Sequence, residues 1–197
     1  MHEEIAIAGT GGQGVLFAGR LLAEAALLED REVVWMPSYG AEKRGGSVYC
    51  NIIISDERIG AMVVVRPHAA IAMNLAWTER FEPAIKPGGL LIVNKSLVPR
   101  QLKRDDIQVI YLPANDLAAE LGDDSAANLI ALGTLISCRP VVSPSSIYAA
   151  MDNMLAKNRK RLEFNKRALN KGLEMAPAKI SPTTSSSARP HPRATSL

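Results

Sequence analysis

A glycine-rich turn near the start of the chain has the spacing most able to support chemistry. Gly9, Gly11 and Gly14 follow the pattern G-x-G-x-x-G, between an apolar run at 4–8 and a helical pattern. Glycines permit a tight turn, and the unpaired amides at the start of a helix attract phosphates and carboxylates. The pattern favours an anion site or a subunit contact, and a purely structural turn is the alternative. Gln13, beside the third glycine, could cap exposed backbone.

A nicotinamide dinucleotide is a weaker expectation for this turn. Proteins that bind one place an acidic residue at the end of the second strand, where it hydrogen-bonds to the ribose. Here that strand is predicted at 33–36, ended by Pro37, and Ser38 and Tyr39 follow it without a carboxylate. A free-standing NAD(P)-binding Rossmann dehydrogenase stays as the alternative enzyme, and micromolar affinity of the chain for the nucleotide would favour it.

The segment 38–46 is the second place where chemistry is expected. It is polar, charged and contains glycine, which predicts an exposed loop. Loops of this kind often carry function.

Cysteine and histidine are too sparse to predict a metal centre, an iron–sulfur cluster or a catalytic triad. Cys50 and Cys138 are far apart, so neither a local metal site nor a cluster ligand set is expected, and both fit small buried hydrophobic residues. His2, His68 and His191 have no partner cluster in the sequence. We therefore predict no metal ligands and no catalytic residue in this chain.

The charge balance argues against a domain that holds nucleic acid. The chain has 23 basic and 20 acidic residues, and the excess is accounted for by Lys179, Arg189 and Arg193 near the C-terminus. Nucleic-acid binders show a strong basic excess. The basic stretch 157–171 keeps such a module as an alternative, but Phe164 is its one aromatic residue for stacking on bases.

No membrane span or secretory signal is predicted. The longest apolar stretches, such as 129–136, are far shorter than the roughly 20 residues that a spanning helix needs. The N-terminus lacks the basic region and cleavage site of a signal peptide, so a cytoplasmic protein is expected.

These segments need elements that position them, and the periodicity predicts a single α/β domain over 1–175. We expect a mostly parallel, Rossmann-like sheet with an added antiparallel hairpin, formed by 47–55 and 59–65, and a C-terminal helical segment. A tail rich in Pro, Ser and Thr, 176–197, is expected to be disordered. The remaining strands are predicted at 4–8, 33–36, 69–73, 90–93 and 108–112, and helices after Gly14 and at 75–85, 116–121, 127–138, 144–155 and 159–173.

Five segments, taken in order, go beyond a generic dinucleotide-binding pattern. Together they resemble the gamma-subunit family of 2-oxoacid:ferredoxin oxidoreductases, most closely its 2-oxoglutarate type, over about residues 3–175. Ala41, where many relatives carry proline, and Lys43 depart from the pattern. The segments are IAGTGGQGV at 7–15, SYGAEKRGGS at 38–47, IISDERI at 53–59, NLIALG at 128–133 and NKRALNKG at 165–172.

The resemblance implies a supporting subunit of a multisubunit enzyme. Its partners would be thiamine-binding alpha and beta subunits, a ferredoxin-like iron–sulfur subunit, and external ferredoxin or another acceptor. The assembled enzyme would decarboxylate a 2-oxoacid oxidatively to an acyl-CoA, with thiamine diphosphate, magnesium and iron–sulfur clusters on the partner subunits. We expect 2-oxoglutarate as substrate, with pyruvate, branched-chain and aromatic 2-oxoacids as alternatives. The isolated chain is expected to be inactive.

By the same resemblance, the turn and the loop 38–46 would border the shared active site or a coenzyme A channel. Arg44 could bind a phosphate or carboxylate, and Glu42 could orient Arg44 or contact a neighbouring subunit; a solvated loop is the alternative for both, and packing is the alternative for Tyr39. Asn128 and Asn165 are expected to make helix or interface contacts. The predicted cofactor-binding residues are Gly9, Thr10, Gly11, Gly12, Gln13, Gly14, Ser38, Tyr39, Gly40, Glu42, Arg44 and Gly45.

Overall fold

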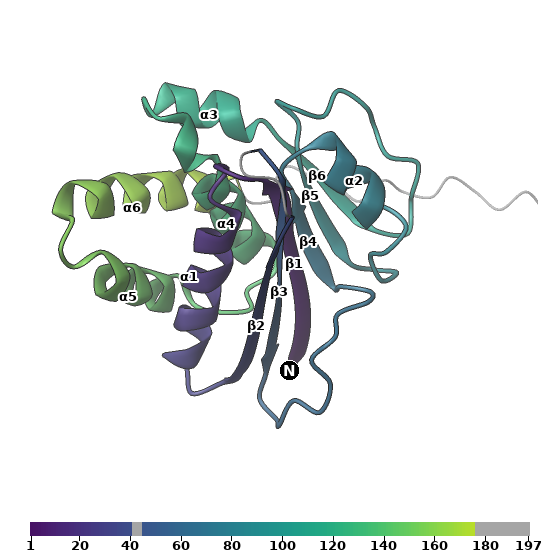
Figure 1. Ribbon diagram of the computed structural model, residues 1–197, viewed down its shortest axis with the longest axis horizontal. Helices are drawn as coiled ribbons and strands as arrows, with labels where there is room; N and C mark the ends of the chain where they lie inside the picture. Colours follow the sequence, from purple (N-terminus) through teal and green to yellow (C-terminus); the bar gives the residue numbers. More distant parts are fainter. Residues whose placement is uncertain (41–44, 176–197) are drawn as a thin grey trace, which may run out of the picture.

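Strands interspersed with two helices make up residues 2–112, and residues 114–173 are helical (Figure 1). A computed structural model describes residues 1–40 and 45–175. The strands are β1 His2–Thr10, β2 Glu32–Tyr39, β3 Ser47–Ser55, β4 Ala69–Ala72, β5 Leu90–Asn94 and β6 Gln108–Leu112. The helices are α1 Val15–Leu27, α2 Leu75–Phe81, α3 Ala114–Glu120, the 3₁₀ turn η1 Asp124–Ala126, α4 Ala127–Cys138, α5 Pro144–Leu155 and α6 Arg159–Leu173.

The six strands form one sheet in the order β2-β3-β1-β4-β5-β6. β1, β4, β5 and β6 run parallel to one another, whereas β3 is antiparallel to both β1 and β2. This confirms the predicted α/β class, with a mostly parallel sheet and an added antiparallel pair.

The location of the antiparallel hairpin was predicted incorrectly. The expected pair was 47–55 with 59–65, but β3 pairs with β2 on one side and with β1 on the other. Both edges of β3 are therefore occupied, and no edge is left for 59–65, which lies outside the sheet.

β2 is also longer than predicted. Pro37 was expected to end the strand, but β2 continues to Tyr39, with Pro37 opposite Cys50. Because β2 is the edge strand of the sheet, one of its residues can lack an amide hydrogen without breaking a central ladder.

The two faces of the sheet are covered very differently. α1 and α4 lie on one face, and α5 and α6 pack outside them, as Figure 1 shows. α4 is buried at every position from Ala127 to Ile136 because it lies between the sheet and α6. Among the described residues, the opposite face carries the short α2, part of the connection between β5 and β6, and Val64 and Val65 from the connection between β3 and β4. In the described ranges, no helix is long and apolar enough to cross a bilayer.

Two glycines set the close crossing of α4 and α6. A Cβ added at Gly133 would lie 2.3 Å from the Leu169 carbonyl oxygen, and one at Gly172 would lie 2.0 Å from the Ile130 carbonyl oxygen. The Thr134 hydroxyl also donates across the crossing to the Gly172 carbonyl, at 3.2 Å. Both glycines belong to the C-terminal segments of the family resemblance, so these segments have a packing role.

Candidate functional site

The candidate site lies where the chain leaves two neighbouring parallel strands in opposite directions. β1 continues into α1 on one face of the sheet, whereas β4 continues into α2 on the other face. Such a switch leaves a crevice outside the carboxyl ends of the two strands, and open α/β sheets bind ligands there. The turn Gly9–Gly14 forms one side of this crevice.

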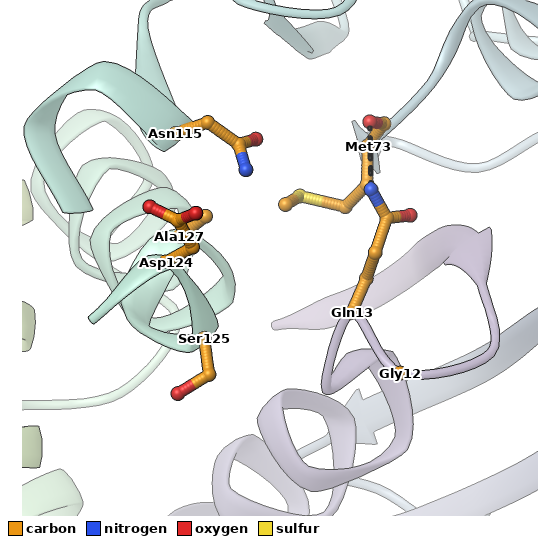
Figure 2. A pocket seen from close by; sticks show the side chains of 7 residues that line it. All are labelled: Gly12, Gln13, Met73, Asn115, Asp124, Ser125 and Ala127. Atoms are coloured by element: carbon orange, nitrogen blue, oxygen red, sulfur yellow. Dashed lines mark hydrogen bonds between the residues drawn. The ribbon is translucent and has the colours of Figure 1, made fainter. Parts of the chain in front are cut away.

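A pocket of about 210 Å³ occupies the crevice (Figure 2). One wall comes from the glycine-rich turn and the end of β4, and the facing wall comes from α3, η1 and the start of α4. The lining residues are Gly12, Gln13, Met73, Asn115, Asp124, Ser125 and Ala127.

Gln13 braces the turn with both ends of its side chain. Its Oε1 accepts hydrogen bonds from the Thr10 amide, at 2.7 Å, and from the Thr10 hydroxyl, at 2.9 Å. Its Nε2 donates to the Met73 carbonyl at 3.4 Å, the dashed contact in Figure 2. The amide therefore ties the turn after β1 to the end of β4. The suggestion that Gln13 caps exposed backbone is confirmed.

The polar network continues from Met73 to the far wall of the pocket. The buried Asn94 donates through Nδ2 to the Met73 carbonyl, at 3.2 Å, and to Asn115 Oδ1, at 2.7 Å. Because Oδ1 of Asn115 is used in this way, its Nδ2 is directed into the pocket, as Figure 2 shows. The pocket therefore presents an amide donor on a fixed support.

Asp124 adds a carboxylate to the same wall, and η1 is held by ionic contacts. Arg161 Nη1 lies 2.8 Å from Asp123 Oδ2, and its Nη2 donates to the Ser125 hydroxyl at 2.8 Å. Hydrogen bonds from Ser125, together with the Arg161 guanidinium, hold the pKa of Asp123 below its ordinary value. Because the described lining has an acid and no base, the pocket itself suits an uncharged polar group better than a phosphate.

The backbone beside the pocket, unlike the pocket lining, favours an anion. α1 begins after Gly14, which has a φ of 71° and gives no side-chain cap, and its first turn contains no acid. The first amides of α1 therefore remain available to an anion. Asn128 fixes this end of the helix, because its Nδ2 donates to the Gly14 carbonyl at 2.8 Å. A Cβ at Gly14 would lie 2.3 Å from that same nitrogen.

The two predicted site segments lie side by side. The Gly11 amide donates to the Gly46 carbonyl at 2.9 Å, and Thr10 pairs with Ser47 in the sheet. The Gly40 amide donates to the Ser47 carbonyl at 2.8 Å, which closes the base of the loop between β2 and β3. Ser38 and Tyr39 end β2, with Tyr39 75% exposed, and Gly45 has a φ of 69°. Glu42 and Arg44 lie outside the described residues.

The profile of one protein family matches residues 4–175, almost the whole described chain. The chain belongs to the pyruvate ferredoxin/flavodoxin oxidoreductase family. The predicted resemblance to the gamma subunits of 2-oxoacid:ferredoxin oxidoreductases is confirmed by relatives and by a solved structure of that kind.

Relatives in the pyruvate ferredoxin/flavodoxin oxidoreductase family differ in length. The ketoisovalerate oxidoreductase subunit VorA of Methanothermobacter marburgensis is 37% identical over 133 residues, which are 68% of this chain and 28% of VorA. The chain thus spans about a third or less of the VorA relatives. The 2-oxoglutarate synthase subunit KorC of Methanocaldococcus jannaschii is 33% identical over 179 residues, covering 89% of this chain and 95% of KorC.

Solved structures from the same family share the fold. The gamma subunit of the keto/oxoacid ferredoxin oxidoreductase of Geobacter sulfurreducens matches with a TM-score of 0.75 and 30% identity, over 89% of this chain and 99% of that one. The 2-oxoglutarate:ferredoxin oxidoreductase of Magnetococcus marinus matches with a TM-score of 0.81 and 23% identity, over 90% of this chain and 31% of that one. The second likeness concerns the fold alone.

Five residues that line the pocket were not among the predicted site residues, namely Met73, Asn115, Asp124, Ser125 and Ala127. Met73 directly follows β4, so the rule that ligands bind at the carboxyl ends of parallel strands could have found it. Asn115, Asp124 and Ser125 come from α3 and η1, and no local pattern marks them. Their approach to the turn depends on how α4 packs on the sheet.

Neither thiol lines the pocket. Burial raises the pKa of Cys50 to about 12, and burial also raises the pKa of Cys138. The interpretation of Cys50 as a small buried residue is confirmed, and Cys138 is half-buried.

Proposed function

We propose that this chain is the gamma subunit of a 2-oxoacid:ferredoxin oxidoreductase that acts on 2-oxoglutarate. The observation that carries the proposal is the match to KorC of M. jannaschii along 95% of the KorC length, because a subunit named for 2-oxoglutarate synthase aligns with this chain over nearly its full extent. Ketoisovalerate is the second candidate substrate, favoured by the 37% identity to VorA of M. marburgensis.

The chemistry of the proposed enzyme is divided between subunits. Thiamine diphosphate, with magnesium, and iron–sulfur clusters on partner subunits would supply decarboxylation and electron transfer, and coenzyme A would receive the acyl group. This chain would hold and orient a ligand at the crevice between β1 and β4. We therefore expect the isolated chain to be inactive and the complex to work in the cytoplasm.

The residues around the crevice fit coenzyme A, which combines phosphates with amide groups. The first amides of α1 can donate to a phosphate, and Asn115 and Asp124 can pair with the acceptor and donor of a ligand amide. Gln13 would keep the turn in the binding conformation rather than touch the ligand, because both ends of its amide are used inside the protein.

The topology argues against the dehydrogenase alternative. A dinucleotide site needs the second strand beside the first, so that its terminal residue reaches the ribose. Here β3 lies between β1 and β2, and β2 ends in Ser38 and Tyr39. The end of β2 is thus one strand too far from the glycine-rich turn.

Three of the seven basic residues of the stretch 157–171 make ion pairs within the described residues, which weakens the nucleic-acid alternative. Lys166 pairs with Asp152 at 2.6 Å, and Arg161 pairs with Asp123 at 2.8 Å. These contacts hold α6 against its neighbours.

Anaerobic purification of the tagged chain from its own cells tests the proposal. We expect thiamine-binding and iron–sulfur subunits to co-purify, and the complex to reduce a dye with coenzyme A and 2-oxoglutarate. Faster reduction with ketoisovalerate would change the substrate and keep the subunit assignment. Recovery of the chain alone, without activity on any 2-oxoacid, would refute the proposal.

A further inference from the structure

The connection between β3 and β4 exposes an apolar segment to solvent. Met62, Val63 and Val65 are 62%, 72% and 73% exposed. The connection forms a long excursion beside the amino-terminal end of β1 in Figure 1. Isolated exposed hydrophobic residues are ordinary, but a contiguous group of large ones marks an interaction site.

The backbone of this segment is also unpaired. Within residues 1–40 and 45–175, no backbone group of residues 58–66 makes a hydrogen bond. Val63, Val64 and Val65 are β-branched and favour extended structure. The segment therefore has the composition of a strand and free backbone groups, and β3 has no edge to offer it.

A pocket of about 310 Å³ adjoins the segment. Val64 and Val65 form part of its wall, and Tyr49, Trp77 and Phe81 supply aromatic surface. The centroid of the Trp77 ring lies 5.0 Å from that of Tyr49 and 5.3 Å from that of Phe81, so the three rings pack against one another. Apolar side chains from a partner could fill this pocket without rearranging it.

Three cations border the apolar surface. Arg58 and Arg66 are exposed at the two ends of the segment, and the Arg80 guanidinium lies 5.0 Å from the centroid of the Trp77 ring. No ion pair of these three arginines occurs within the part of the chain that the structure describes. A partner surface that covers the segment should therefore carry carboxylates at its border.

A second copy of the chain is a poor occupant. Antiparallel pairing of 58–66 with itself would be centred on Met62 and would place Arg58 opposite Arg66 at both ends. Like charges directly opposite each other destabilise a strand pair. The charge pattern favours a different chain.

We propose that residues 58–66 and the adjoining aromatic pocket form a docking surface for another subunit of the oxidoreductase, through an extended segment whose apolar side chains are bordered by carboxylates. This inference rests on the proposed function, because it takes the partner from the same complex. The partner's apolar side chains enter the pocket beside Val65, and its carboxylates meet Arg58, Arg66 and Arg80.

The test uses the whole complex and compares surface variants in one purification. Val63→Asp places a charge in the apolar segment, and the double variant Arg58→Glu with Arg66→Glu reverses its border. Leu28→Asp is the matched control, because Leu28 is an exposed apolar residue at the end of α1, far from the segment in sequence. Thermal unfolding of each purified chain checks that the fold is kept.

We expect Val63→Asp and the double arginine variant to recover about tenfold less partner subunit, a loss typical of an interface anchor. Leu28→Asp should recover as much partner as the unchanged chain. Full recovery with both segment variants would overturn the docking surface and leave the subunit assignment intact. Equal losses with Leu28→Asp would also overturn it. If the unchanged chain recovers no partner, the proposed function fails, and the docking surface with it.

Discussion

Gln13 shows that a residue in a binding motif can hold the backbone of the motif in place rather than contact the ligand. Its position beside Gly14 made it a candidate ligand contact, but its Oε1 accepts two hydrogen bonds from Thr10. Its Nε2 reaches the Met73 carbonyl and so links two strands across the crevice. Removal of the Gln13 side chain should therefore lower the stability of the protein more than it weakens any direct contact with a ligand.

Gln13→Ala is expected to lower the free energy of unfolding by about 2 kcal/mol, because buried partners lose their hydrogen bonds. Chemical denaturation measures this loss, and Gln101→Ala, at an exposed position, should change stability by less than about 0.5 kcal/mol. Unchanged stability combined with weaker binding of coenzyme A would show instead that Gln13 is a ligand contact.

At the scale of elements, the helices with a clear periodicity or cap could be predicted from the sequence, whereas the pairing partners of the strands could not. The bounds of α4, α5 and α6 agree with the prediction, and Ser143 caps α5 by accepting from the Ser146 amide. The segment 59–65 was predicted as a strand from its composition, but strand formation depends on a free neighbouring edge. The turn and the loop could be found as candidates from glycine and charge, whereas the pocket wall from α3 and η1 could not.

The crossing of α4 and α6 gives a prediction at this scale. Gly172→Ala gains about 1 kcal/mol of helix propensity but forces a methyl group against the Ile130 carbonyl, so we expect a net loss of about 2 kcal/mol. Denaturant titration checks it against Gly60→Ala, where an added Cβ meets nothing within 4 Å. Equal free energies of unfolding for the two variants would contradict this prediction, because they would mean that α4 and α6 can move apart without loss of stability.

Across the whole molecule, the two ends of the sheet differ in chemistry. The carboxyl end has the amide network of Gln13, Asn94 and Asn115, whereas the amino end is ionic. There Arg139 binds Glu3 through two contacts, at 2.7 and 2.8 Å, and Lys86 pairs with Glu4 at 3.0 Å. His68 lies in this ionic group and accepts the Glu4 amide at Nδ1, at 3.0 Å.

The ionic end predicts a pH dependence. Burial, followed by the charges of Lys86 and Arg139, lowers the pKa of His68 below 6.5, against the opposing effect of Glu3 and Glu4. The unfolded chain therefore takes up the proton first, and stability should fall as the pH drops from about 6.5 toward the folded pKa. His68→Asn keeps an acceptor for the Glu4 amide without titrating, so its unfolding free energy should fall less over that range. Parallel pH profiles of the two proteins would contradict this assignment.

The antiparallel position of β3 also bears on the order in which the molecule assembles. β2 and β3 pair across a short loop, with Tyr39 opposite Val48, whereas β1 pairs with the more distant β3, with Thr10 opposite Ser47 and His2 opposite Ser55. The parallel pairs β4–β5 and β5–β6 are nearer in sequence than β1 and β3, because Ala69 pairs with Leu90 and Leu90 with Gln108, whereas the pairing of Ile5 with Ala69 closes the longest loop of the sheet. Because local contacts form faster than distant ones, we expect the pair β2–β3 and the group β4–β5–β6 to form first, and β1 to join them last and complete the sheet.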